Sequence, residues 1–269
     1  MSESGGDPFS KPRCLGPDYA AQFQDEAVAA AYHGRPPYPE ELFTFVGGLQ
    51  PKGPGRVLEL GCGTGDLTIW LAGHVGHIDA VEPSQAMLRV ARARPGGGSD
   101  RITWHEAYAE DFAISEPYDL VVAAESLHWM DWSVVIPKIA AALAPGAFLA
   151  VAGRSRILPE GIGSAVSKLI AQYSTNRDYE PYDAVRMLTE RGLFEEVGRE
   201  RFEGSFEQPV DVYIEGIHSQ NGFSRDRMSP EASAEFDAAV HEIAAPYASN
   251  GVLHVGVDGV VVWGRVTGV

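Results

Sequence analysis

The sequence is poor in cysteine and contains no long apolar run. Only two of its 269 residues are cysteines, Cys14 and Cys62. Two isolated cysteines in a chain of this length are typical of a reducing compartment, with one disulfide between them as the alternative. No apolar stretch reaches the roughly 18 to 20 residues that span a bilayer, and residues 1–17 lack the apolar core of a signal peptide. We therefore expect a cytoplasmic protein with no membrane partner.

The chain also has little positive charge. It carries 21 Lys and Arg residues against 37 Asp and Glu residues, which gives a formal net charge of −16. A surface this negative repels phosphate backbones, and no run of basic residues interrupts it. We expect no nucleic-acid partner, while the oligomeric state stays open.

Short apolar segments alternate with helical patterns, which predicts an α/β fold with a parallel sheet covered on both faces. We expect a single domain over residues 18–269, comprising an N-terminal lid (18–50) and a mostly helical cap insertion (about 207–259), after a flexible tail (1–17). The expected strands are 56–60, 78–82, 102–106, 120–124, 148–153, 197–206 and 260–266. The expected helices are 18–32, 39–47, 65–72, 84–94, 133–143, 160–173 and 182–191.

The most informative segment is a glycine loop that follows the strand 56–60. Gly61, Gly63 and Gly65 are separated by single residues and precede a helix. Glycines allow positive φ and let a ligand lie against the backbone. Glu82 ends the next strand, where it could accept hydrogen bonds from both hydroxyls of a ribose. The loop indicates a nucleotide-like ligand; the alternative is a tight turn with no ligand.

NAD is the main rival for this ligand. Dinucleotide sites prefer the pattern G-x-G-x-x-G, whose second glycine approaches a pyrophosphate. This chain instead has three alternate glycines preceded by an acid, Glu59. An acid there is unfavourable beside a diphosphate and favourable near the ammonium of a methionine moiety.

Four stretches in the correct order resemble the class I S-adenosylmethionine-dependent methyltransferases. They are the glycine loop (58–65), the ribose-binding acid and the following helix (80–88), the fourth strand with its edge (118–129) and the turn into the fifth strand (143–149). The resemblance covers roughly residues 35–153. Within the class, Arg35-Pro36-Pro37-Tyr38-Pro39 and Leu127-His128-Trp129 resemble the type 11 branch, which contains the trans-aconitate methyltransferases and other small-molecule methyltransferases.

The resemblance implies a Rossmann-like seven-stranded sheet with an antiparallel last strand. It also implies S-adenosylmethionine as cofactor and S-adenosylhomocysteine as product. One departure concerns the adenine contact, where the family often has Gly-Asp-Ala and this chain has Ala107-Tyr108-Ala109. By position, the resemblance implies the cofactor residues Gly61, Gly63, Gly65, Glu82, Ser84, Met87, Ala109 and Glu110. Tyr32 and Arg35 follow the N-terminal helix and could cover the cofactor as a lid, with Arg35 at its methionine carboxylate or, alternatively, at the solvated surface. Glu59, Cys62, Pro83 and Glu125 complete the candidate set.

Methyl transfer is an in-line displacement that depends chiefly on alignment, so no obligatory catalytic dyad is expected. His128 is the candidate base because it follows the fourth strand, with a role in shaping the pocket as an equal alternative. The acceptor atom is oxygen or nitrogen, with carbon the least favoured. The candidate substrate residues are Trp129, Trp132, Tyr213 and His218, each of which could instead serve packing or the surface.

Three further points remain open in the sequence. An acidic acceptor would need cationic anchors, for which Arg154, Arg156 and Arg186 are candidates, whereas an aromatic acceptor would suit the tryptophans. No metal is expected, because the histidines lack the acidic or cysteine partners of a metal site. The alternative functions are an NAD-dependent oxidoreductase and a non-methylating member of the fold, acting as a cyclase or partner subunit.

Overall fold

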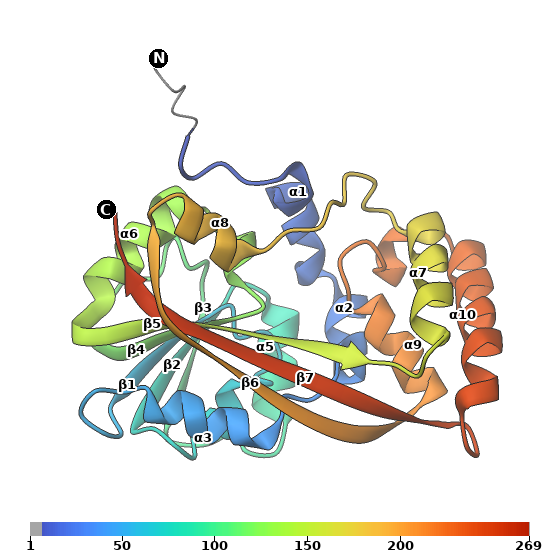
Figure 1. The fold of residues 1–269 in the computed structure, drawn as a ribbon, viewed down its shortest axis with the longest axis horizontal. Helices are drawn as coiled ribbons and strands as arrows, with labels where there is room; N and C mark the ends of the chain where they lie inside the picture. The colour runs from blue at the N-terminus through green and yellow to red at the C-terminus, as the bar shows by residue number, and fades with distance from the viewer. Residues whose placement is uncertain (1–6, 269) are drawn as a thin grey trace.

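The computed structural model describes residues 7–268 and places seven strands in one sheet, in the order β3-β2-β1-β4-β5-β7-β6 (Figure 1). Strands β1 to β5 pair in parallel, whereas β7 runs antiparallel to both β5 and β6. The prediction of a Rossmann-like sheet with an antiparallel last strand is confirmed. The strands are β1 Arg56–Leu60, β2 His77–Glu82, β3 Ile102–Glu106, β4 Tyr118–Ala124, β5 Leu143–Ile157, β6 Phe194–Pro209 and β7 Val252–Val266.

Helices cover both faces of the sheet because the central strands are apolar on both sides. Val57 of β1 packs in one core with helices α3, α4 and α5, whereas its neighbour Leu58 packs in a second core with α6 and α8. Successive residues of a strand point to opposite faces, which explains this division. The helices are α3 Glu40–Gly48, α4 Thr68–Leu71, α5 Gln85–Ala93, α6 Trp132–Ala142 and α8 Ala184–Glu190.

A helical cap is built at the end of the long ribbon formed by β6 and β7 (Figure 1). It comprises α7 Ile162–Tyr173, α9 Val210–His218 and α10 Pro230–Ala244, whose apolar faces share one core with residues of β7. The insertion between β6 and β7 covers residues 210–251, shorter than the expected 207–259, because both strands extend further toward the cap.

The N-terminal segment differs from the expectation. In place of one helix over residues 18–32 there are two short ones, α1 Pro17–Ala20 and α2 Glu26–Ala31, separated by the extended backbone of Asp25 with ψ 134°. Three 3₁₀ turns flank them, η1 Arg13–Leu15, η2 Ala21–Gln24 and η3 Tyr32–Gly34.

The flexible tail expected over residues 1–17 is also corrected in part. Residues 1–6 lie outside the described chain, but Cys14 and Leu15 are buried. The Lys11 ammonium donates hydrogen bonds to the carbonyl oxygens of His128 and Met130 at 3.0 and 2.6 Å. The described part of this segment therefore packs against the loop after β4.

Residues 7–268 include both cysteines and all the described helices. Cys14 and Cys62 are both buried free thiols, so they do not form the alternative disulfide. Within the described residues, no helix has both the length and the hydrophobicity that a membrane crossing requires.

Candidate active site

A cavity of about 1590 Å³ lies at the carboxyl ends of the parallel strands. In an open α/β sheet, this edge beside the point where strand order reverses is where ligands bind, and here β1 and β4 are neighbours at that point. The sequence-predicted residues among its lining are Tyr32, Arg35, Gly61, Gly63, Glu82, Pro83, Met87, Ala109, Glu110, Glu125, His128 and Trp129.

The three glycines of the loop have different surroundings. All three have positive φ, from 55° to 77°. A Cβ on Gly61 would lie 2.4 Å from the Ser126 side chain, and one on Gly65 would lie 2.8 Å from Trp104, so internal packing requires both glycines. Beside Gly63 the nearest atom is the Tyr32 hydroxyl at 3.7 Å. Gly63 therefore faces open space in the cavity, as a residue against which a ligand lies.

Glu82 is held rigidly at the end of β2. Its carboxylate accepts hydrogen bonds from the backbone N–H of Gly63 at 3.0 Å and of Ser84 at 2.9 Å. Burial raises the pKa of Glu82 to about 7, against the effect of these two donors. A carboxylate has about four acceptor sites, so oxygen lone pairs remain for a ligand diol in the cavity.

Glu59, expected to bind cofactor, lies beneath the loop instead. It is buried in β1 and accepts a hydrogen bond from the Thr68 hydroxyl at 2.6 Å, and it does not line the cavity. Burial raises its pKa to about 8, so the side chain is mostly protonated at pH 7. Its role is to join β1 to the start of α4.

This burial predicts a pH effect on stability. Because the folded-state pKa of Glu59 lies above its unfolded value, the folded protein loses stability as pH rises from about 4.5 to about 8. Glu59→Gln imitates the protonated acid and keeps an acceptor for Thr68. We expect the variant to be more stable than wild type by about 1–3 kcal/mol at pH 8.5, measured by urea unfolding. A less stable variant at pH 8.5 would show instead that Glu59 is needed in its ionised form.

Three other expected cofactor residues support the loop from outside the cavity. Ser84 is fully buried and caps α5, where its hydroxyl accepts from the Met87 N–H at 3.3 Å. Cys62 packs in the core shared with α3 and α4, and Gly65 packs against Trp104. These three residues do not line the cavity, and their side chains or Cβ positions serve internal packing.

The expected adenine side of the cavity is formed by Pro83, Met87, Ala109 and Glu110. Tyr108, the departure from the family pattern, also lines the cavity and is 57% exposed. An exposed ring at this position offers a flat apolar surface to a base. We keep stacking of Tyr108 on adenine as a prediction.

An aromatic group surrounds His128, which lines the same cavity. The imidazole lies 4.8 Å from the Trp129 ring and 5.0 Å from Tyr182, measured between centroids, and Phe23 of the N-terminal segment lies 5.2 Å from Trp129. Burial, with the charges of Lys11 and Arg35, lowers the pKa of His128 to about 3. The imidazole is therefore neutral at pH 7.

Three of the four expected substrate residues lie elsewhere. Trp132 is fully buried in the core under α6 and donates its indole N–H to the Leu127 carbonyl at 2.8 Å. Tyr213 belongs to the cap core, and His218 is buried between the Phe223 carbonyl and the Asp237 carboxylate. None of the three lines the cavity, because helix packing turns each side chain inward.

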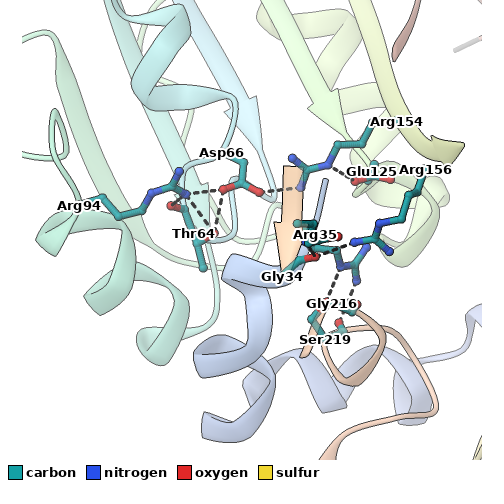
Figure 2. A network of polar contacts seen from close by, with 11 residues as sticks. Gly34, Arg35, Thr64, Asp66, Arg94, Glu125, Arg154, Arg156, Gly216 and Ser219 are labelled. Atoms are coloured by element: carbon teal, nitrogen blue, oxygen red, sulfur yellow. Dashed lines mark hydrogen bonds and ion pairs between the residues drawn. The ribbon is translucent and has the colours of Figure 1, made fainter. Parts of the chain in front are cut away.

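Arginines on β5 and in the N-terminal segment border the cavity (Figure 2). Arg154 pairs with Asp66 at 2.6 Å and with Glu125 at 3.2 Å, and Asp66 also pairs with Arg94. Arg35 donates two hydrogen bonds to Ser219 of α9. Arg186, the third candidate anchor, lies on α8 with a largely exposed side chain and does not line the cavity.

Several lining residues carried no sequence signal. They come from the N-terminal segment and the loop after α7, and they reach the cavity only through contacts distant in sequence. The additional lining residues include Lys11, Cys14, Leu15, Tyr19, Phe23, Asn176, Tyr179 and Tyr182.

Among the described residues there is no group of three or more His, Cys, Asp or Glu side chains that could hold a metal ion.

The strand order, the antiparallel β7, the glycine loop and the ribose-directed Glu82 together define a Rossmann-like methyltransferase fold. Residues 57–146 match the family model described as a methyltransferase domain. This match covers a third of the chain, and together with the fold it supports the resemblance to the class I S-adenosylmethionine-dependent methyltransferases and to their cofactor.

Similar proteins agree with this assignment. An uncharacterized methyltransferase of Mycobacterium tuberculosis is 37% identical over 131 residues, 48% of this chain and 51% of that protein. A trans-aconitate 2-methyltransferase of Streptomyces avermitilis is 33% identical, over 37% of this chain and 39% of that protein. The chain thus spans about half or less of the length of these relatives.

A solved structure with a similar fold covers most of the chain. It is an Anaeromyxobacter dehalogenans protein assigned as a type II methyltransferase, with 26% identity and a TM-score of 0.66 over 86% of this chain and 97% of that one. These findings favour S-adenosylmethionine over NAD, the rival ligand considered from the sequence.

Proposed function

We propose that this protein transfers the methyl group of S-adenosylmethionine to an oxygen or nitrogen atom of a small molecule, with carbon the least favoured acceptor. One observation carries the proposal: Gly63 and Glu82 line the same cavity as His128 and Trp129. The first pair suits the cofactor's nucleoside, and the second pair borders space for an acceptor.

When bound, the cofactor supplies a methyl group already activated by a positive sulfur. The chain's own residues hold and enclose the reactants. Glu82 fixes the ribose, and the Trp129 ring offers an aromatic face to a sulfonium. Phe23 closes against Trp129 and limits access of water. Such alignment can supply about 7 to 11 kcal/mol of barrier reduction in the best intramolecular cases.

His128 has the protonation state of a proton acceptor. Its imidazole is neutral at pH 7 and can accept a hydrogen bond from the O–H or N–H that is methylated. Because its pKa is low, it orients the attacking O–H or N–H as a hydrogen-bond acceptor, and the proton leaves to water as the new bond to the methyl carbon forms and the methyl–sulfur bond breaks. We expect His128→Ala to lower kcat by about 100-fold, the lower end of positioned proton transfer. The wild-type rate should show no inflection near pH 6.5.

The function is tested with S-adenosylmethionine labelled in its methyl group and a panel of phenols, hydroxy acids and amines. Mass spectrometry would detect labelled product together with S-adenosylhomocysteine, and the His128→Ala rate would follow in the same assay. Cofactor binding without transfer to any acceptor would contradict the proposal and favour a cyclase or partner subunit. A wild-type inflection near pH 6.5 would contradict the neutral role of His128.

The remaining sequence-based expectations concern the protein's surroundings. A cytoplasmic location, a small-molecule acceptor and the absence of nucleic-acid or membrane partners stay predictions. So does a reaction without a metal ion.

A further inference from the structure

Charges near the cavity are unevenly compensated. Arg154 and Arg94 lie against Asp66 and Glu125, so that two positive charges meet two negative ones. Burial alone would lower the pKa of Arg154, but neighbouring acidic groups, Asp66 and Glu125 among them, raise it overall. This part of the network is electrically satisfied without a ligand (Figure 2).

Arg35 and Arg156 have no such partners. Within residues 7–268, Arg35 donates only to the hydroxyl and carbonyl oxygens of Ser219, at 2.6 and 2.8 Å. Arg156 donates only to the Gly34 carbonyl, at 2.7 Å, while its guanidinium lies over the Tyr213 ring. All of these are neutral groups, so neither guanidinium forms an ion pair with a described carboxylate.

Arg156 has fewer hydrogen-bond partners than Arg35. Its Nε is buried and makes no hydrogen bond to any described residue. Burial, together with the nearby charges of Arg35 and Arg154, lowers the pKa of Arg156 to about 10, so the charge is retained at pH 7. A buried charge without an opposite charge costs free energy. That cost is offset when an anion enters the cavity that Arg156 lines.

Two uncompensated guanidiniums call for two negative groups. The cofactor brings one carboxylate, on its methionine moiety, and Arg35, which lines the cavity from the N-terminal lid, is the candidate to bind it. Arg156 lies further along β5 and stacks on Tyr213 of α9, on the cap side of the cavity. The second negative group must come from the other reactant.

We propose, resting on the methyltransferase function above, that the acceptor carries a carboxylate and that Arg156 binds it. The planar guanidinium suits a planar carboxylate. Tyr213 of the cap, over which Arg156 lies, thereby contributes to acceptor selection, whereas Ser219 holds the cofactor-directed Arg35. His128 and Trp129 then face the remainder of the acceptor.

The test measures binding, without turnover. Protein saturated with S-adenosylhomocysteine is titrated calorimetrically with glutarate, 4-hydroxybenzoate and citrate, and with the methyl ester of each. We expect at least one acid to bind about tenfold or more tightly than its ester, since a charge-assisted pair contributes at least that factor. Arg156→Gln should remove this preference while S-adenosylhomocysteine affinity stays within about threefold.

Three further variants separate the roles. Arg156→Lys keeps the charge and should retain part of the preference for acids. Arg35→Gln should weaken S-adenosylhomocysteine itself. Arg186→Gln, which removes an exposed arginine of α8 outside the cavity, should change neither affinity.

Acids that bind no better than their esters, or an acid preference that survives in Arg156→Gln, would overturn the carboxylate subsite. So would an equal loss of S-adenosylhomocysteine and acid binding in Arg156→Gln. Absence of S-adenosylhomocysteine binding to the wild type would contradict the proposed function itself, and the two failures are therefore distinguishable.

Discussion

Glu82→Ala is expected to weaken binding of S-adenosylhomocysteine by about 100-fold or more. The ribose offers two hydroxyls to this carboxylate, and hydrogen bonds to a charged group contribute about 1.5–3 kcal/mol each. The substitution also removes the acceptor that holds the N–H groups of Gly63 and Ser84. Isothermal titration of wild type and variant at pH 8, where the wild-type carboxylate is mostly ionised, measures the loss.

The matched control is Glu106→Ala. Glu106 pairs in register with Glu82 at the end of the neighbouring strand β3, is exposed and does not line the cavity. The Glu106→Ala variant should bind S-adenosylhomocysteine with the same affinity as the wild type. Equal affinities of Glu82→Ala and wild type would refute the ribose-binding role, and an equal loss in both variants would point to net charge as the cause.

The second large effect is on stability. Trp132→Ala is expected to lower the free energy of unfolding by about 3–5 kcal/mol, the usual cost of removing a fully buried large aromatic side chain. The variant leaves a cavity beneath α6 and removes the donor to the Leu127 carbonyl, which then stays buried without that partner. Urea unfolding followed by circular dichroism gives the value.

Trp129→Ala is the comparison for this measurement. Trp129 is half-buried and lines the cavity against Phe23 and His128. We expect it to cost about 1 kcal/mol or less in stability and to impair methyl transfer. If Trp129→Ala lowered stability by several kcal/mol and Trp132→Ala impaired only methyl transfer, the assignment of Trp132 to the core and Trp129 to the site would be wrong.

The sequence predicted most accurately the features encoded over a few neighbouring residues. The glycine spacing determines the backbone conformation of the loop, and the end of β2 determines where the Glu82 side chain lies. Gly61, Gly63 and Glu82 accordingly line the cavity, as the sequence predicted. The seven-stranded sheet with an antiparallel last strand followed from the family resemblance. The signal for Trp132 was also local but weaker: Asp131 accepts the Ser133 N–H and caps α6, which places Trp132 in its first turn facing the core.

Side-chain direction and distant contacts could not be read in the same way. Glu59 lies on a strand buried on both faces, and no periodicity shows that it turns toward Thr68. The pairing of Lys11 with the loop at His128 joins residues 117 positions apart. Arg156 received no role beyond that of a possible anchor, because its lack of a carboxylate partner is visible only in three dimensions.

The central claim, that the cavity holds S-adenosylmethionine, is tested most directly by calorimetric titration of the wild-type protein with S-adenosylhomocysteine and, separately, with NAD. The structure predicts one-to-one binding of S-adenosylhomocysteine with a micromolar dissociation constant and no measurable heat from NAD. Binding of NAD without binding of S-adenosylhomocysteine would contradict the account.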